Sequence, residues 1–377
     1  MAAREMSMGV VPMNDEVGDI GGSGLPSTIL DNIRSAFAKV AAGKDNNEEK
    51  YAVVMPDELL YDDDGLDIWA EIIFTKGNYQ TQDEINLFER YSPEIAEYMP
   101  NGTTMFDIGA GDMKKVNILL THLNKIGRKA TYLGLDISQD SLLYNIHKYA
   151  PGHEDSTVSM AGLWGNFDLG RAYCSALPDT EEPRIFLSLG SVFFNNRWDN
   201  AVDFLKEWAA VMRPQDLILA GMDSHEITDD KIWAAYHARE DLFRAFFENG
   251  LKHANKLLKE DVFRPEDWSV PGEIDEEDSR HVFYLTAERD VVVGAAATGT
   301  GKELAIKKGT KLEWFDAHKR TQKMVEDMCA EAGLEVIKSW AIAPSEMRQY
   351  LIRRVPEKGA ETVYSDSDSG IVVVHEV

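Results

Sequence analysis

Residues 106–116 read FDIGAGDMKKV, a short apolar run that ends in an acid and in two glycines separated by one residue. A helical pattern follows at residues 114–126, so the glycines lie at a turn between a strand and a helix. Turns of this kind bind ligands at the carboxyl edge of a parallel sheet, because glycine lets the backbone approach the ligand closely. The stretch therefore predicts an α/β fold with a ligand site at this turn.

The chain around this turn indicates the same fold. Four runs of strand type read TTMFDIG, KATYLGLDIS, RIFLSLGS and DLILAGMD, and helical patterns cover residues 114–126, 140–148 and 198–211 between them. Strands that alternate with helices form a doubly wound, mainly parallel sheet. The segments LEVIKSWAIAP and MRQYLIRRV predict a hairpin that ends this sheet.

The other segments predict a second, α+β part of the molecule. Helical patterns precede the sheet, and after Asp223 a long helical pattern gives way to antiparallel strands. Ser27 or Thr28 is expected to cap the first helix, and Thr81 with Glu84 to form a capping box. The predicted division is a flexible leader at 1–26, a substrate-binding domain at 27–83 with 227–316, a domain built on the sheet at 84–226 with 317–356, and a mobile tail at 357–377.

The composition points to a small-molecule partner. The chain has 377 residues and a net charge of −26, which opposes binding to nucleic acid or an anionic membrane surface. Cys174 and Cys329 lie in no metal-binding or disulfide pattern, and no apolar run is long enough to span a membrane. We expect a cytosolic, reduced protein without a metal site, and the sequence leaves the oligomeric state open.

The glycine turn lacks the features of phosphate-binding loops. There is no Walker A pattern, and Lys114 stands where a dinucleotide fingerprint has its third glycine. Asp107 suits a cationic amine, and Asp136, at the end of the next strand, suits a ribose. S-adenosylmethionine carries both groups and no phosphate, so these residues favour a methyltransferase. The alternatives are a purely structural turn and, for Asp136, a helix cap together with Ser138.

The stretch FDIGAGDMKKVNILLTHLNKIGRKATYLGLDIS resembles the histidine-specific N-alpha-methyltransferases, which make histidine betaine for ergothioneine. It is most similar to fungal relatives that methylate dimethylallyltryptophan or tryptophan. AGLWGNFDLGR, FLSLGSVFFNN, AAYHAREDLFRAFFENGLKHANKLL and TKLEWF match as well, and the likeness runs over residues 60–354. The resemblance implies a class I methyltransferase fold of Rossmann type, S-adenosylmethionine as cofactor and an amino-acid substrate.

The resemblance also implies a role for each matching position. In the cofactor site Lys115 would contact the carboxylate end, Asp136 the ribose, and Leu163 with Trp164 the adenine. Leu163 replaces an acid of the family, which leaves backbone groups for adenine recognition. The full set implied for the cofactor is Asp107, Gly109, Ala110, Gly111, Lys115, Asp136, Leu163, Trp164 and Gly190.

On the substrate side, Asn195 would bind the amine and Tyr236 the carboxylate, and these two are the candidate catalytic residues. Tyr61 and Phe246 would line the pocket, and Glu313 matches a glutamate of the substrate domain. Each assignment has a simpler alternative, such as a helix cap for Asn195, a core position for Tyr236 and a solvated lysine at Lys115. The set implied for the substrate is Tyr61, Asn78, Asn195, Tyr236, Phe246 and Glu313.

Two departures from the family concern the substrate. Asn78 stands where the histidine enzymes have a tyrosine that contacts imidazole, and the chain is about two residues longer after Glu313. Trp314 and Phe315 suggest an aromatic pocket suited to an indole. The main interpretation is therefore N-methylation of the alpha-amine of an aromatic amino acid, of the tryptophan or dimethylallyltryptophan type. The alternatives are a histidine N-alpha-methyltransferase and a non-catalytic regulatory protein that binds the cofactor.

Overall fold

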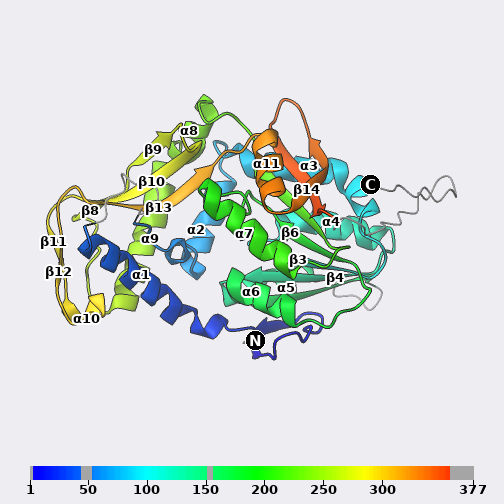
Figure 1. Cartoon of the computed structure of the whole chain (residues 1–377), viewed down its shortest axis with the longest axis horizontal. Helices are drawn as coiled ribbons and strands as arrows, with labels where there is room; N and C mark the ends of the chain where they lie inside the picture. The colour runs from blue at the N-terminus through cyan, green and yellow to red at the C-terminus, as the bar shows by residue number, and fades with distance from the viewer. Residues whose placement is uncertain (1–2, 44–52, 151–155, 357–377) are drawn as a thin grey trace.

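The computed structural model describes residues 3–43, 53–150 and 156–356. The predicted tail at 357–377 lies outside the described residues. Figure 1 shows a large sheet flanked by helices beside a second part that carries the strands β8–β13. The helix α2 (Asp63–Ile73) lies between the two parts.

The large sheet has nine strands in the order β1-β2-β5-β4-β3-β6-β7-β15-β14. Neighbours from β1 to β7 run parallel, whereas β15 is antiparallel to both β7 and β14. This is the doubly wound sheet with a terminal hairpin that the sequence predicted. The strands are β1 (Arg4–Glu5), β2 (Val17–Asp19), β3 (Thr103–Ile108), β4 (Ala130–Asp136), β5 (Val158–Trp164), β6 (Arg184–Ser188), β7 (Leu217–Asp223), β14 (Leu334–Ala341) and β15 (Met347–Arg354).

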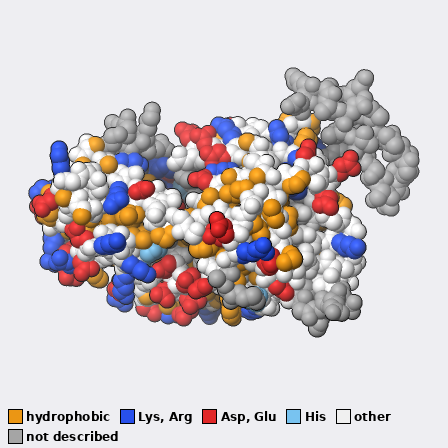
Figure 2. All heavy atoms as spheres, turned by 90° about the horizontal axis from the view of Figure 1, so that it is seen from below, with side chains coloured by type: hydrophobic (Ala, Val, Ile, Leu, Met, Phe, Trp, Pro, Cys, Tyr) orange, Lys and Arg blue, Asp and Glu red, His pale blue; other side chains and the backbone are white. Residues whose placement is uncertain are grey.

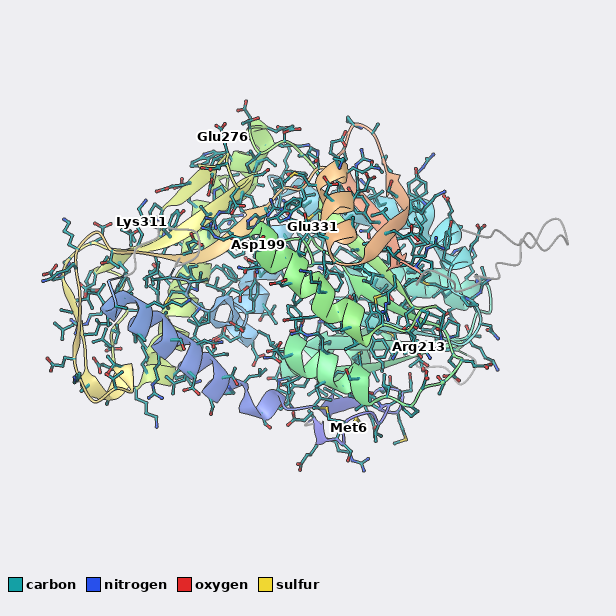
Figure 3. The ribbon with its side chains drawn as sticks, viewed as in Figure 1. Met6, Asp199, Arg213, Glu276, Lys311 and Glu331 are labelled. Carbon is teal, nitrogen blue, oxygen red and sulfur yellow. The ribbon has the colours of Figure 1, made fainter. Side chains whose placement is uncertain are left out.

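Two layers of helices cover the sheet because each helix has one apolar face. Buried side chains of α3, α4 and α5 pack on one face, and those of α6, α7 and α11 pack on the other. Trp198 of α7 donates to Glu331 of α11 at 3.2 Å, and Figure 3 shows Glu331 close to Asp199. The helices are α3 (Tyr79–Glu97), α4 (Lys114–Lys125), α5 (Gln139–Tyr149), α6 (Phe167–Ala176), α7 (Trp198–Val211) and α11 (Gln322–Glu331).

The second part has a core of its own. One cluster of buried apolar side chains comes from residues 29–72 and 227–317 alone. Its antiparallel strands confirm the pattern expected after Asp223, although the long helix there is broken in two. The elements are α1 (Leu25–Ala41), η3 (Asp57–Leu60), α8 (Asp230–His237), α9 (Glu240–Leu258), β8 (Trp268–Ser269), β9 (Gly272–Asp275), β10 (Arg280–Ala287), β11 (Val291–Val293), α10 (Ala295–Thr298), β12 (Leu304–Ile306) and β13 (Lys311–His318). This separation of the cores supports the division into domains, which we keep as a proposal.

Three local expectations are wrong. The leader has regular structure, because β1 and β2 extend the sheet beyond β5 and a short 3-10 helix, η1 (Gly22–Gly24), follows them. The helix α1 then begins at Leu25 with a proline in its first turn, so neither Ser27 nor Thr28 caps it. Likewise α3 begins at Tyr79, which places Thr81 inside the helix and removes the capping box.

The face seen in Figure 2 carries acidic and basic side chains side by side, with apolar side chains near its middle. It is hollowed where the two parts of the molecule meet. Among the residues described, no helix is both long and apolar enough to cross a membrane. Cys174 and Cys329 are buried free thiols.

Candidate active site

The glycine turn joins β3 to α4 at the carboxyl edge of the sheet. Gly109 and Gly111 have φ angles of 78° and 52°, which are strained for residues with a side chain. The amides of Gly109 and Ala110 both donate to Leu135 O at 3.0 Å, so β4 fixes the turn. A Cβ at Gly109 would meet only the ring of Phe167, at 3.8 Å. The hydrogen bonds to β4 therefore hold the turn in place, and no neighbour crowds Gly109.

Asp136 lies directly beside this turn. One carboxylate oxygen accepts from the amide of Gly111 at 2.9 Å, and the other accepts from Ser138 at 3.1 Å. Each oxygen keeps a lone pair, and the side chain is 9% exposed. Asp136 can therefore accept from the two hydroxyls of a ribose without giving up its hold on the turn.

Asp107 is enclosed beneath the same turn. One carboxylate oxygen accepts from the hydroxyl of Tyr132 at 2.7 Å, and the other has no partner among the residues described. Burial raises the pKa of this carboxyl to about 7, and the hydrogen bond from Tyr132 only partly opposes the rise. A buried acid with an unused oxygen fits a site that receives a cationic group.

Glu84 links three segments of this site, although the sequence indicated only a helix cap for it. Its carboxylate accepts from Lys115 Nζ at 2.7 Å, from the amide of Gly190 at 3.0 Å, and from Gln349 at 2.6 Å. Burial acts to lower the pKa of Lys115, but Glu84 outweighs it and the net shift is upward. Lys115 and Gly190 thus already have a partner within the protein, and Glu84 holds both at the cofactor side of the sheet.

The segment after β2 packs against Trp164, one of the two residues expected beside adenine. Leu163 is 1% exposed and belongs to the core, so its side chain is not open to a ligand. The indole of Trp164 donates to Ile137 O at 2.9 Å, and the amide of Ile20 donates to Trp164 O at 3.1 Å. A Cβ at Gly22 would lie 2.4 Å from the Trp164 ring, so the segment after β2 packs directly on that ring.

The two candidate catalytic residues differ in how they are held. Asn195 donates to Asp316 O at 3.1 Å and accepts from the amide of His318 at 2.8 Å, so its amide joins the loop after β6 to β13. Tyr236 is 3% exposed and stacks on His281 at 4.5 Å between ring centroids. Asn195 caps no helix, since α7 begins after Arg197 without a side-chain cap. Tyr236 does belong to a buried apolar cluster, as its simpler alternative expected.

An aromatic cluster lies next to Tyr236. The ring of Phe315 lies 5.6 Å from Trp69 and 6.3 Å from Phe246, and Tyr61 lies 5.5 Å from Phe246. Burial, with a contribution from the charge of Asp57, raises the pKa of the Tyr61 hydroxyl. We call Tyr61, Trp69, Phe246 and Phe315 the aromatic cluster; Trp69 is a member that the sequence analysis did not single out.

Trp314 takes no part in this cluster. Its indole donates to Pro56 O at 3.2 Å, and its ring lies against Gly250 of α9. The pairing of β10 with β13 shifts register here, because Tyr284 faces Glu313 whereas Phe283 faces Phe315. Phe315 thus belongs to the aromatic cluster and Trp314 does not, and the aromatic pocket itself stays a prediction.

Two further substrate candidates are buried polar groups. Glu313 is held by two arginines, with its oxygens 2.7 Å from Arg197 and 3.1 Å from Arg280. Arg280 is 1% exposed and also binds Asp316 at 3.0 Å. Asn78 is 6% exposed, and its side-chain oxygen has no partner among the residues described. Glu313 is thus committed to the protein's own arginines, whereas Asn78 keeps a free acceptor.

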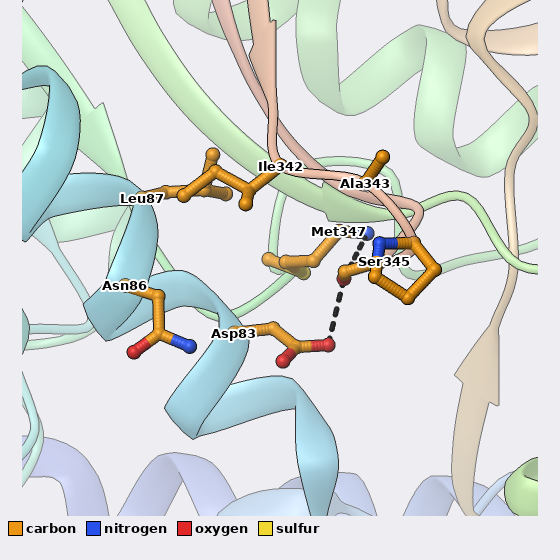
Figure 4. Close-up of a pocket in the computed structure, with 8 residues that line it drawn as sticks. Asp83, Asn86, Leu87, Ile342, Ala343, Ser345 and Met347 are labelled. Atoms are coloured by element: carbon orange, nitrogen blue, oxygen red, sulfur yellow. Dashed lines mark hydrogen bonds between the residues drawn. The ribbon is translucent and has the colours of Figure 1, made fainter.

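A separate pocket of about 220 Å³ lies between α3 and the turn that precedes β15 (Figure 4). Its lining includes Asp83, which accepts from Ser345 at 2.7 Å. None of the predicted site residues lines it. Among the described residues no group of His, Cys, Asp or Glu has the arrangement of a metal site.

Known proteins resemble this chain over most of its length. Residues 38–354 match the family model described as histidine-specific methyltransferase, SAM-dependent. An ergothioneine biosynthesis protein 1 of Neurospora crassa is 28% identical over 82% of this chain, which spans only 34% of that protein. The N-methyltransferase dtpB of Aspergillus flavus is 30% identical, with 76% of this chain and 80% of that protein covered.

A third relative matches nearly end to end. The 4-dimethylallyltryptophan N-methyltransferase easF of Arthroderma benhamiae is 27% identical, and the match covers 89% of this chain and 99% of that protein. The sheet order, the open glycine turn with Asp136 beside it, and the family match over most of the chain all agree. The chain belongs to the histidine-specific, S-adenosylmethionine-dependent methyltransferase family.

Proposed function

We propose that this protein methylates the α-amine of an aromatic amino acid of the tryptophan or dimethylallyltryptophan type, with S-adenosylmethionine as the methyl donor. The Aspergillus and Arthroderma relatives are named as N-methyltransferases, which supports N-methylation. The observation that carries the choice of side chain is the aromatic cluster beside Tyr236, together with the commitment of Glu313 to Arg197 and Arg280.

The cofactor would be held at the carboxyl edge of the sheet. Asp136 is suited to the ribose hydroxyls and Asp107 to the ammonium of the aminoacyl end. Glu84 keeps Lys115 and the loop at Gly190 in place beside them. Bound there, S-adenosylmethionine supplies an electrophilic methyl group on a sulfonium cation.

The protein's own contribution to catalysis is mainly alignment. Tyr236 would hold the carboxylate of the substrate, the aromatic cluster would hold its side chain, and Asn195 would fix the loop beside its amine. The amine must be neutral to act as a nucleophile. A cationic site disfavours the protonated amine, because like charges repel.

Histidine remains the second candidate substrate, because the family model and the Neurospora relative are named for histidine and ergothioneine. The two arginines bind Glu313 and offset its charge, which weakens it as an acceptor for an imidazole N–H. A non-catalytic role is the third candidate. Incubation with S-adenosylmethionine and each of histidine, tyrosine, tryptophan and dimethylallyltryptophan, read by mass, separates the three: methylated indole amino acids support the proposal, methylated histidine supports the second, and no product supports the third.

A further inference from the structure

A fully enclosed lysine lies beside Tyr236, just after β13. The side chain of Lys319 is 1% exposed, and its Nζ lies 3.2 Å from an oxygen of Asp223. Nζ also donates to the hydroxyl oxygen of Tyr236 at 3.1 Å. An unpaired ammonium in this position would be strongly unfavourable, so the pairing with Asp223 is what allows a lysine here.

The surroundings of Asp223 favour its ionised form. It ends β7 with no exposed side-chain surface, and it accepts from Tyr79 at 2.6 Å, from Gln80 at 2.9 Å and from His225 at 2.5 Å. Burial acts to raise its pKa, but Lys319 and these hydrogen bonds outweigh burial and lower it. The ammonium of Lys319 is therefore anchored by an ionised carboxylate on the sheet.

The hydroxyl of Tyr236 accepts twice within this network. Its oxygen receives one hydrogen bond from Lys319 and a second from Gln80 Nε2 at 3.2 Å. An ammonium and an amide NH₂ can donate but not accept. The phenolic hydrogen of Tyr236 consequently has no acceptor among the residues described and is left for a ligand.

Tyr79 shows how a tyrosine beside Asp223 behaves when no lysine lies between the two. Its hydroxyl donates directly to Asp223. Lys319 and Gln80 both contact Asp223 and Tyr236 at once, so they occupy the positions between the carboxylate and the second phenol. They keep the proton of Tyr236 from turning to Asp223, and they place positive charge behind it.

We propose that Lys319 is a positioning residue, which fixes the hydroxyl of Tyr236 as a donor to the substrate carboxylate and makes the protein selective for free α-amino acids over their amides and decarboxylated amines. The inference rests on the proposed function and narrows its substrate class. A cation that polarises the donor also strengthens the hydrogen bond to an anion.

The test compares an amino acid with its amide in three forms of the full-length protein. Tryptophan and tryptophan amide are the probes, or histidine and its amide if histidine is the amino acid methylated. The forms are wild type, Lys319→Met, and the double variant Asp223→Asn/Lys319→Met, which leaves no unpaired buried charge. Michaelis constants are measured, or inhibition constants for a compound that is not methylated. Lys307→Met, at an exposed lysine, is the control.

The proposal expects wild type to prefer the acid over the amide. Both Lys319 variants should raise the Michaelis constant of the acid about tenfold, the value of a hydrogen bond to a charged group, while the amide and the cofactor bind as before. Equal constants of wild type for the acid and the amide, or an equal rise of both constants in the double variant, would overturn the proposal. Absence of any methylated amino acid in wild type would instead overturn the proposed function, before the variants are compared.

Discussion

The carboxylate of Glu84 lies 2.7 Å from the ammonium of Lys115. It also accepts a hydrogen bond from the amide of Gly190, in the loop after β6. The pair therefore joins α3, α4 and the loop after β6 at one point, where the cofactor is expected. Glu84, which the sequence suggested as part of a helix cap, instead holds Lys115 and Gly190 together beside the expected cofactor site.

Replacing Glu84 with glutamine should destabilise the fold. Removal of one partner from a buried ion pair leaves the other charge uncompensated, so the free energy of unfolding should fall by about 3 kcal/mol. Urea denaturation measures the change. Lys114→Gln is the control. The side chain of Lys114 neighbours Lys115 in sequence, is 39% exposed and pairs with Asp112. Equal effects of the two substitutions would contradict the role given to Glu84.

Replacing Asp136 with asparagine should weaken cofactor binding selectively. The amide NH₂ cannot accept from a ribose hydroxyl and would face the N–H of Gly111 or Ser138. Titration with S-adenosylhomocysteine should show a loss of at least about tenfold. The Michaelis constant of the amino acid at saturating cofactor should not change. Asp140→Asn, at an exposed acid in the first turn of α5, is the control, and an unaltered titration in Asp136→Asn would refute the ribose assignment.

The substitution Asp107→Asn should change the dependence of stability on pH. The folded-state pKa of about 7 lies above the ordinary value of 3.8, so the folded protein holds the extra proton between these values. Wild-type stability should therefore decline as pH rises through this window, by an amount on the order of a few kcal/mol. The variant mimics the protonated acid, and its advantage in urea midpoint should be largest above pH 7 and shrink toward pH 5.

The same variant should bind the cofactor less well. A neutral amide cannot pair with an ammonium, so stability and cofactor affinity should move in opposite directions. Thermal unfolding and cofactor titration at pH 8 measure both quantities on one sample. A variant with higher stability and intact cofactor affinity would show that Asp107 does not receive the ammonium.

Replacing Phe315 with alanine should impair large aromatic substrates most. The ring contacts Trp69, Phe246 and Tyr236, and loss of an aromatic partner in such a cluster corresponds to about tenfold in the Michaelis constant for tryptophan. Michaelis constants for tryptophan and inhibition constants for histidine measure the selectivity. Phe74→Ala, which removes an exposed ring at the end of α2, is the control. A loss of the same size for both amino acids would argue against the aromatic cluster as the side-chain site.

Much of the fold follows from local patterns in the sequence. The glycine turn, the alternating strands and helices and the terminal hairpin each come from contiguous residues, so periodicity and turn chemistry are sufficient to predict them. The leader could not be predicted in this way, because Val17–Asp19 gains its strand only by pairing with β5, far along the chain. Thr81 and Glu84 have the spacing of a capping box, but α3 begins before them, at Tyr79. The Glu84 carboxylate instead contacts Lys115 and Gly190, which are distant in sequence.

The sequence indicated residue types for the candidate site but few of their contacts. The resemblance gave Asp136, Tyr236 and Phe246 positions that lie at the edge of the sheet or in the adjacent core. It could not indicate that Glu313 meets Arg197 and Arg280, since those residues are distant in sequence and no local pattern links them. Lys319 was missed for the same reason, because a lysine after a strand reads as exposed until Asp223 is placed beside it.

The mass of the product from one panel tests the central claim most directly. The protein is incubated with S-adenosylmethionine and, separately, with tryptophan, dimethylallyltryptophan, tyrosine and histidine, and tryptamine is included to report on the carboxylate. The account predicts methyl transfer to the α-amine of an indole amino acid and little or none to histidine or tryptamine. Methylation of histidine alone, or no product while S-adenosylhomocysteine still binds, would contradict it.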